Sequence, residues 1–290
     1  MPSPRGLILA LPFLFVAGAL AGQPEQRLRV ASLSIVPEKW NKEANAREVE
    51  RRVREAAAGA KLIVTPEGVL EGYVVNEVIR EKDASKKVAL IERFQRLAEP
   101  IDGPYIRRFQ ALADELDVWL IIGFLERAGE ALYNSAILIS PEGRIAGNYH
   151  KSHLHQGYDV NPPGYTPGTE YPVFDLGFAR LGILICFDRQ PPEPAQALAL
   201  NGADIIMCPA FGSWGEWNTR LMQVRAYENQ VHVIFTNPHH SLIIDPDGEL
   251  LGESHRDSVL IRDLDLSRPT RSRPSITRRR PETYGALVKK

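Results

Sequence analysis

Residues 182–193 read GILICFDRQPPE, and the character of the chain changes abruptly within them. An apolar, strand-like run ends on Cys186, and Asp188, Arg189 and two prolines follow at once. Cys186 can be interpreted as a small apolar residue that completes a core strand, because free cysteines are often buried. It can also be interpreted as a nucleophile held at the end of a strand. This stretch is compatible with both, so the neighbouring parts of the chain must decide.

On both sides of this stretch, apolar runs typical of strands alternate with segments of helical spacing. Strands are predicted at 28–36, 61–68, 118–127, 204–210 and 231–238, helices at 41–60, 86–99, 103–117, 192–203 and 212–230, and hairpins at 134–151, 173–188 and 241–254. Strands among helices favour an α/β fold, and the hairpins require mixed rather than purely parallel sheets. Since no repeat or Pro/Ser-rich linker divides the chain after its N-terminal segment, we expect a single domain over 27–290.

The composition is that of an ordinary soluble globular protein. The chain has 290 residues, of which 44% are hydrophobic and 24% are charged. Its formal net charge is −1, so no overall basic field argues for a nucleic acid as partner. The basic segment 268–290 is interpreted as a solvated or interface-lining face.

The N-terminal residues differ from the rest and predict a secretory signal over 1–21. Arg5 precedes an apolar run over 7–20, and residues 19–21 read Ala-Leu-Ala, a small-x-small cleavage site. The run is short for a membrane span and contains Pro12, so an N-terminal membrane anchor is the second interpretation. No cysteine follows the run, which excludes lipid attachment there. We expect an exported protein, periplasmic or secreted, that has no membrane partner once the signal is removed.

Export bears on the two cysteines, Cys186 and Cys208, because an oxidising compartment could pair them. A chain of this length needs no disulfide, and both cysteines end apolar runs where a strand passes into a loop. A disulfide is therefore not favoured, although the sequence leaves it open.

Three strand exits carry chemically distinctive residues, namely Glu67 in LIVTPEG, Lys151 in NYHKSHL and Cys186 in LICFD. Each of them has an ordinary interpretation as a solvated loop charge, an edge charge or a core residue. Together they supply a base, a cation and a soft nucleophile. A thiol attacks as the thiolate, a carboxylate can take its proton, and an ammonium can hold the anionic oxygen of a tetrahedral intermediate.

At these residues the chain resembles the nitrilase, or carbon–nitrogen hydrolase, superfamily of cysteine amidases. The resemblance rests on PEGVLEGY at 66–73, NYHKSHL at 148–154, ICFDRQPPE at 185–193, RAYENQ at 225–230 and RRRPETY at 278–284. It covers about 28–284, nearly the whole chain after the signal. Each motif is weak by itself, but three of them in the right order at strand ends are specific.

The resemblance implies an αββα sandwich of two mixed β-sheets flanked by helices, usually assembled into homodimers or higher homo-oligomers through helices. It also implies a Glu–Lys–Cys triad that works without metal or organic cofactor. Cys186 would be the nucleophile, Glu67 the general base and Lys151 the oxyanion-stabilising cation, with the N–H of Phe187 completing the oxyanion hole. The implied activity is hydrolysis of linear amides or N-carbamoyl compounds through a thioester on Cys186, with water as the second substrate.

Other functions remain open at this point. Nitrile hydrolysis and acyl transfer to an amine use the same thiol chemistry. From a different class, a catalytically silent binding or assembly protein could share the fold. Since such a protein would be under no demand to keep the glutamate, lysine and cysteine together, the sequence favours catalysis.

One position departs from the family. Many of its amidases have a second glutamate six residues before the proline of a Pro-Gly pair, and here that position is Asn161. Asp159 lies close by and could replace it in orienting the substrate. Two further residues are candidates for substrate binding. Trp214 lies between glycines and is either a pocket wall or core, and Arg189 presents a fork for a substrate carboxylate or is salt-bridged to an acid such as Glu193.

A cluster of histidines raises the question of a metal. His150, His153 and His155 have a spacing that could supply zinc ligands. Lys151 lies among them and would repel a metal ion. We therefore expect no metal site, and we interpret His153 as a residue that braces the lysine loop.

Overall fold

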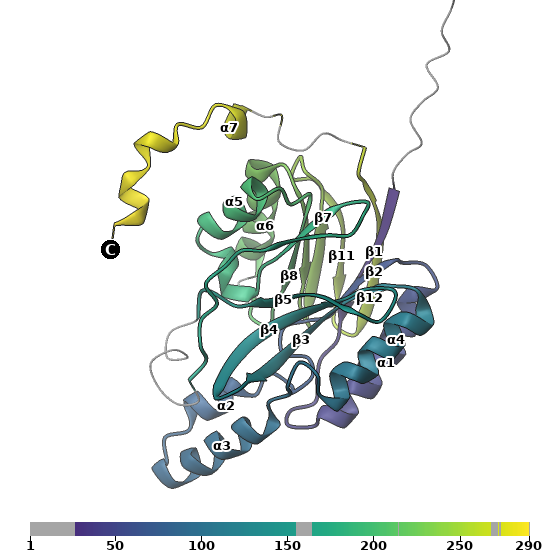
Figure 1. Ribbon diagram of the computed structural model, residues 1–290, viewed down its shortest axis with the longest axis vertical. Helices are drawn as coiled ribbons and strands as arrows, with labels where there is room; N and C mark the ends of the chain where they lie inside the picture. Colours follow the sequence, from purple (N-terminus) through teal and green to yellow (C-terminus); the bar gives the residue numbers. More distant parts are fainter. Residues whose placement is uncertain (1–26, 155–163, 214, 268–271, 273, 290) are drawn as a thin grey trace, which may run out of the picture.

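The computed structural model describes residues 27–154, 164–213, 215–267, 272 and 274–289. Two six-stranded mixed sheets lie face to face between layers of helices (Figure 1). The predicted α/β class and αββα arrangement are thereby confirmed. The predicted signal segment lies outside the described residues.

Both sheets have a parallel centre with antiparallel strands at the edges. In order across the first sheet lie β12 (Ser258–Asp265), β1 (Arg27–Ser34), β2 (Leu62–Val64), β3 (Trp119–Ala128), β4 (Ala131–Ile139) and β5 (Ile145–His150). In order across the second lie β11 (Leu250–His255), β10 (His240–Ile244), β9 (His232–Thr236), β8 (Ile205–Pro209), β7 (Arg180–Ile183) and β6 (Val173–Asp175). Strands β1, β2 and β3 are mutually parallel, as are β7, β8 and β9, and the carboxyl ends of β2 and β7 lead toward the candidate site.

The helices form the two outer layers and one end of the molecule. The first sheet is covered by α1 (Lys42–Ala57) and α4 (Pro104–Leu116), and the second by α5 (Glu193–Leu200) and α6 (Glu216–Asn229). At one end lie α2 (Val75–Arg80) and α3 (Ala84–Leu97). The 3₁₀ turn η1 (Cys186–Arg189) follows β7, and α7 (Pro274–Thr277), η2 (Pro281–Thr283) and η3 (Gly285–Val288) form a C-terminal segment that extends away from the sandwich.

Burial follows the alternation expected for strands that are covered on both faces. In β2, Leu62 and Val64 face the second sheet, whereas Ile63 faces the layer of α1 and α4. The interface between the sheets also contains polar pairs. Ser32 of β1 and Thr236 of β9 are hydrogen-bonded at 2.7 Å in the buried core.

Most predicted elements are present, and the differences are local. The strand that precedes Cys186 ends at Ile183, so the thiol lies three residues beyond the strand and opens a 3₁₀ turn rather than ending the strand itself. Helix α2 and strand β12 are further elements that we did not predict. Both cysteines are free and buried. None of the described helices has the length and apolar character needed to span a membrane.

Candidate active site

Glu67 is held in the turn that follows β2, where Pro66 ends the strand. Its carboxylate is 1% exposed and accepts hydrogen bonds from three groups distant in sequence. Oε1 accepts from Lys151 Nζ at 2.7 Å and from Asn134 Nδ2 at 2.8 Å, and Oε2 accepts from the Phe211 N–H at 2.9 Å. These three donors fix the orientation of a buried carboxylate that would otherwise be costly to remove from water.

Lys151 immediately follows β5 and is equally buried, at 1% exposed. Both backbone polar groups of Lys151 are hydrogen-bonded, since its N–H donates to Asn134 O at 2.9 Å and its carbonyl accepts from Gly168 N at 2.9 Å. Burial by itself would lower the pKa of Lys151, but the charges of Glu67 and of a Cys186 thiolate raise it above its ordinary value. The ammonium form is therefore favoured and placed to hold a second negative charge.

Cys186 opens the turn η1 with a φ of 47°, in the left-handed region that non-glycine residues rarely adopt. Such strain persists only where the surroundings enforce it. The backbone is extended at Ile185 and turns sharply at the cysteine, which is 8% exposed. A Cβ built on Gly212 would lie 3.9 Å from Sγ, so the chain that carries Phe211 to Glu67 also passes the thiol. Phe187 follows in the same turn.

Asp188 joins the loop after β5, which carries Lys151 and His153, to the turn η1, which carries Cys186. This fully buried carboxylate accepts from the Ile185 N–H at 3.0 Å, from Tyr149 Oη at 2.8 Å and from the His153 N–H at 2.7 Å. The His153 ring nitrogen Nδ1 also lies 3.1 Å from Asp188, and this hydrogen bond raises the pKa of His153. The contacts match the expectation that His153 braces the lysine loop.

The guanidinium of Arg189 lies behind the cysteine and is directed at protein acceptors. Arg189 is 2% exposed, and its Nε donates to Asn218 Oδ1 at 2.9 Å and its Nη2 to Gly212 O at 3.1 Å. Its Nη1 donates to the carbonyl of Cys186 and lies 3.4 Å from Sγ. These contacts hold the guanidinium against the turn that carries Cys186, and the two roles suggested by the sequence, substrate binding and a salt bridge, stay predictions.

Other predicted residues lie outside the described part of the chain, namely Asp159, Asn161, Trp214 and His155. Their predicted roles stay predictions. The remaining histidines of the cluster make hydrogen bonds, since His150 Nε2 lies 2.9 Å from Glu126 Oε2. Among the described residues, no group of three or more histidine, cysteine or acidic side chains is placed to hold a metal ion.

Sequence reasoning missed Asn134 and Phe211, which contact Glu67 directly. Asn134 lies on β4 among apolar residues, and a polar residue in a buried strand was the available signal. The Phe211 contact uses a backbone N–H, which no side-chain pattern reveals. Glu71, four residues after Glu67, was also missed and is 3% exposed.

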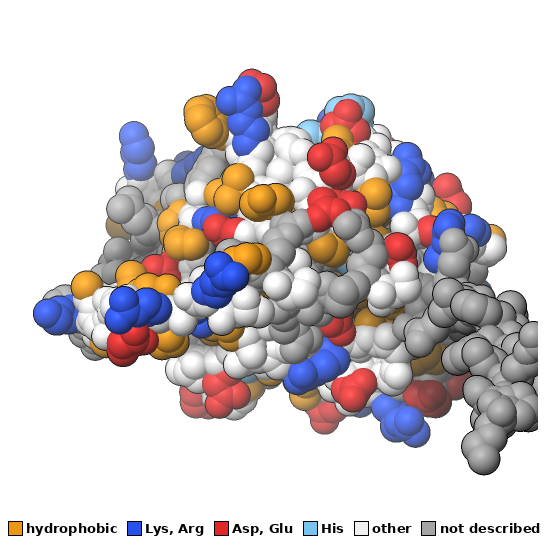
Figure 2. Space-filling view, turned by 90° about the horizontal axis from the view of Figure 1, so that it is seen from above, with side chains coloured by type: hydrophobic (Ala, Val, Ile, Leu, Met, Phe, Trp, Pro, Cys, Tyr) orange, Lys and Arg blue, Asp and Glu red, His pale blue; other side chains and the backbone are white. Residues whose placement is uncertain are grey.

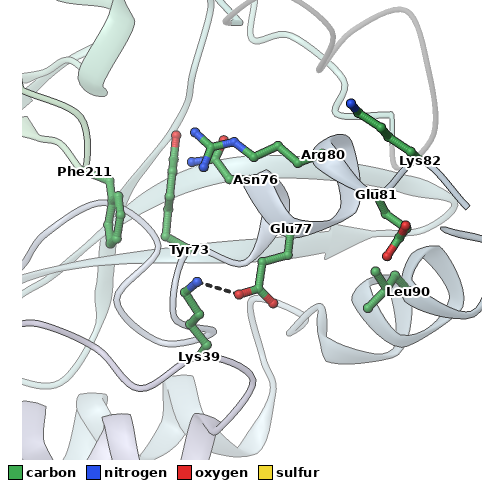
Figure 3. A pocket seen from close by; sticks show the side chains of 9 residues that line it. All are labelled: Lys39, Tyr73, Asn76, Glu77, Arg80, Glu81, Lys82, Leu90 and Phe211. Atoms are coloured by element: carbon green, nitrogen blue, oxygen red, sulfur yellow. Dashed lines mark hydrogen bonds and ion pairs between the residues drawn. The ribbon is translucent and has the colours of Figure 1, made fainter. Parts of the chain in front are cut away.

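A cavity of about 780 Å³ opens beside this cluster (Figure 3). Phe211 and Tyr73 form its inner end, with their rings stacked at 4.3 Å. The remaining lining residues come from α2 and its neighbours, namely Lys39, Asn76, Glu77, Arg80, Glu81, Lys82 and Leu90.

The sequence is similar to members of one enzyme family. Residues 29–273 match the carbon-nitrogen hydrolase family. An N-carbamoylputrescine amidase of Arabidopsis thaliana is 34% identical over 84% of this chain and 90% of its own. A citrullinase of Francisella tularensis is 30% identical over 86% and 94%.

Solved structures agree on the fold. A carbon-nitrogen hydrolase from Helicobacter pylori superposes with a TM-score of 0.75 at 22% identity, covering 92% of this chain and 99% of the other. An amidase from Nesterenkonia sp. superposes with a TM-score of 0.72 at 21% identity, covering 93% and 99%.

Proposed function

This chain belongs to the carbon–nitrogen hydrolase family and is an enzyme of that class, and we propose that it cleaves linear amides or N-carbamoyl compounds through a thioester on Cys186. The observation that carries the proposal is the buried 2.7 Å contact between Glu67 and Lys151 beside a strained cysteine turn. The names of two relatives refer to N-carbamoylputrescine and to citrulline, both of which end in a carbamoyl group. That agreement supports the carbamoyl class.

In the proposed acylation step, Glu67 accepts the thiol proton as Cys186 Sγ attacks the carbonyl carbon. The carbonyl π-electrons move to oxygen, and Lys151 Nζ with the Phe187 N–H hold the resulting oxyanion. When the tetrahedral intermediate collapses, the C–N bond breaks and the leaving nitrogen takes the proton from Glu67. The products of this step are a free amine or ammonia and the thioester.

Deacylation uses the same groups in the reverse order of proton transfer. Glu67 takes a proton from water, and the hydroxyl oxygen attacks the thioester carbon. The second oxyanion meets the same two donors, and its collapse breaks the C–S bond. The thiolate takes the proton back from Glu67, which restores the resting enzyme and releases an acid.

The test is intact-protein mass spectrometry after exposure to panels of amides, N-carbamoyl compounds and nitriles. We expect an acyl adduct on the wild-type protein and none on Cys186→Ser. Cys208→Ser is the matched control, because burial raises the pKa of the Cys208 thiol to about 12 and keeps it unreactive. That variant should keep the adduct and the turnover.

The competing functions give different outcomes in the same experiment. A catalytically silent protein would form no adduct with any panel and would release no amine or ammonia. An adduct with nitriles alone would place the activity in the nitrile branch, and wild-type rates in Cys186→Ser would refute the thioester mechanism.

We also propose that Arg189 acts as a positioning residue for the cysteine turn. It supports the turn through the Cys186 carbonyl and Sγ and through Gly212 O. Arg189→Gln should then lower kcat for carboxylate-bearing and neutral substrates alike and lower the melting temperature. A loss confined to carboxylate-bearing substrates would restore the substrate-binding role that the sequence suggested.

Assembly as a homodimer or higher homo-oligomer is a further proposal. Large apolar side chains are exposed on α6 and the C-terminal segment, namely Trp217 (70%), Val224 (49%), Tyr227 (57%), Leu287 (61%) and Val288 (86%). Figure 2 shows hydrophobic side chains gathered on one half of the face seen from above, on the side of α5, α6 and the C-terminal segment. Light scattering on the eluting protein should give at least twice the chain mass, and Val224→Asp should reduce it.

Export stays a proposal as well and rests on the composition of residues 1–21. Cell fractionation followed by N-terminal sequencing tests it. A mature chain that begins near residue 22 in the periplasm or medium supports export. An uncleaved chain that sediments with membranes would support the N-terminal anchor instead.

A further inference from the structure

The cavity beside α2 adjoins the reacting groups, so it is placed to receive the part of a substrate remote from the scissile bond. Phe211 lines the cavity and also donates its N–H to Glu67, and the next residue, Gly212, faces Cys186 Sγ. The cavity volume of about 780 Å³ lies in the range that holds drug-sized ligands and exceeds the volume of the smallest amides.

The acidic side chains of this cavity already have partners within the protein. Glu77 accepts from Lys39 Nζ at 2.5 Å and from Trp40 Nε1 at 2.5 Å, and the Lys39 hydrogen bond lowers its pKa. Glu81 accepts from the Asp83 N–H at 2.8 Å, and Figure 3 shows its carboxylate directed toward Leu90. The charge of Lys39 is therefore paired with that of Glu77. Neither Glu77 nor Glu81 faces the inner end of the cavity, which Phe211 and Tyr73 form.

Arg80, at the end of α2, has a different position. Its side chain is exposed, and within the described residues no carboxylate lies within ion-pair distance of its guanidinium. Figure 3 shows the guanidinium turned back along α2 toward the Asn76 amide and the Tyr73 ring, with the Lys82 side chain apart from these groups. Asn76 and Arg80 are four residues apart on α2 and therefore lie on one face of that helix, and Tyr73 precedes the helix.

A planar guanidinium presents paired N–H donors that match the two oxygens of a carboxylate. A terminal ammonium at the same place would meet the positive charge of Arg80. On the premise of the function proposed above, we propose that this cavity binds a carboxylate at the end of the substrate remote from the scissile C–N bond. Arg80 is the determinant of that specificity.

The test compares ureido substrates of equal chain length that end in a carboxylate, a methyl group or an ammonium. Arg80→Gln should raise KM for the carboxylate-ended substrate about tenfold and leave kcat nearly unchanged, with the methyl-ended substrate altered by less than about twofold. Arg80→Glu should shift the preference toward the ammonium-ended substrate. Lys86→Gln removes a positive charge from the neighbouring helix α3 outside the cavity lining, and it should change neither.

Equal losses for all three termini in Arg80→Gln, or the same loss in Lys86→Gln, would overturn the proposal. A binding measurement separates this failure from failure of the proposed function. In a Cys186→Ser background, calorimetry should show tighter binding of the carboxylate-ended compound than of the methyl-ended one, and Arg80→Gln should remove the difference. If wild-type protein cleaves neither ureido compounds nor linear amides but this difference is present, the proposed function fails and the carboxylate site stands. If the difference is absent, the carboxylate site fails irrespective of turnover.

Discussion

At the scale of single residues, the candidate site depends on one buried ion pair whose partners both contact other groups. Lys151 and Glu67 lie 2.7 Å apart, and Asn134 and the Phe211 N–H contact the same carboxylate. Removing one partner of such a pair leaves an uncompensated buried charge, which costs roughly 3–5 kcal/mol. The contribution of the pair to stability and its proposed role in catalysis can therefore be separated by experiment.

Lys151→Met should lower kcat by roughly 100-fold or more through loss of an oxyanion donor and should also lower the free energy of unfolding. Adding Glu67→Gln in the same chain removes the unpaired charge, so the double variant should recover much of the stability and none of the activity. Denaturant unfolding and initial rates on the three variants test this. Recovery of turnover in the double variant would contradict the assigned roles.

Glu71 gives a prediction about pH. Burial raises its pKa to about 7 from an ordinary value of 4.5, against the opposing Leu125 N–H hydrogen bond at 3.0 Å, and the charge of Glu67 adds to the rise. Because the folded-state pKa is the higher one, this carboxyl contributes stability below about pH 4.5 that is lost as the pH rises through 7. The difference corresponds to about 3 kcal/mol.

Glu71→Gln removes this titration. The free energy of unfolding of the variant relative to wild type should therefore increase between pH 5 and pH 8, by up to about 3 kcal/mol. Chemical denaturation at both pH values measures it, with the exposed substitution Glu55→Gln as the control. A difference that is independent of pH would show that Glu71 titrates normally.

At the scale of elements, the turn that carries Glu67 depends on a close approach of strand β3. A Cβ on Gly123 would lie 2.4 Å from Pro66 O, 2.9 Å from Gly68 N and 3.0 Å from Glu67 Cα. All three contacts are with backbone, so the turn that carries Glu67 would have to move. Only glycine fits at this position of β3.

Gly123→Ala should therefore lower kcat by at least about tenfold, because a displacement near 1 Å at a reacting group can cost more than that. The matched control is Gly59→Ala, whose added Cβ would make an ordinary contact of 3.7 Å with Ile261. Steady-state kinetics and melting curves on both variants check this. A Gly123→Ala enzyme with wild-type kcat would show that the turn tolerates the displacement.

The sequence predicted that Glu67, Lys151 and Cys186 follow strands, because apolar periodicity and turn residues are local signals, but it placed Cys186 at the end of its strand rather than three residues beyond it. It could not predict what those residues touch. Phe211 reaches Glu67 across 144 positions, and Asn134 does so across 67. The short helix α2 has its buried residues Val75 and Val78 beside polar ones, a pattern too brief to separate from a loop.

Arg189 shows the same limit for a single side chain. From its position three residues after the cysteine, the sequence left two roles open, a fork for a substrate carboxylate and a salt bridge to a nearby acid. In the structure its guanidinium contacts include an amide oxygen, two carbonyls and a sulfur from three different segments. No local pattern encodes that set.

At the scale of the whole molecule, the two sheets must keep their relative position, because Glu67 and Lys151 follow strands of one sheet and Cys186 follows a strand of the other. The buried apolar residues of the interface hold the sheets together but do not by themselves fix one relative position of the two sheets. The hydroxyl pair Ser32 and Thr236, 2.7 Å apart between β1 and β9, is directional and lies in the same interface.

A double-mutant cycle measures how much this pair contributes. Ser32→Ala or Thr236→Val alone leaves a buried hydroxyl without its partner, and each should cost about 1–3 kcal/mol of unfolding free energy. The double variant leaves neither hydroxyl, so it should be more stable than the sum of the single losses predicts, with a coupling energy near 1 kcal/mol.

If the hydroxyls also fix the relative position of the sheets that brings Cys186 to Glu67, kcat should fall in the double variant even though its stability is partly restored. Strictly additive losses, measured by chemical denaturation, would show that apolar packing alone sets this relative position.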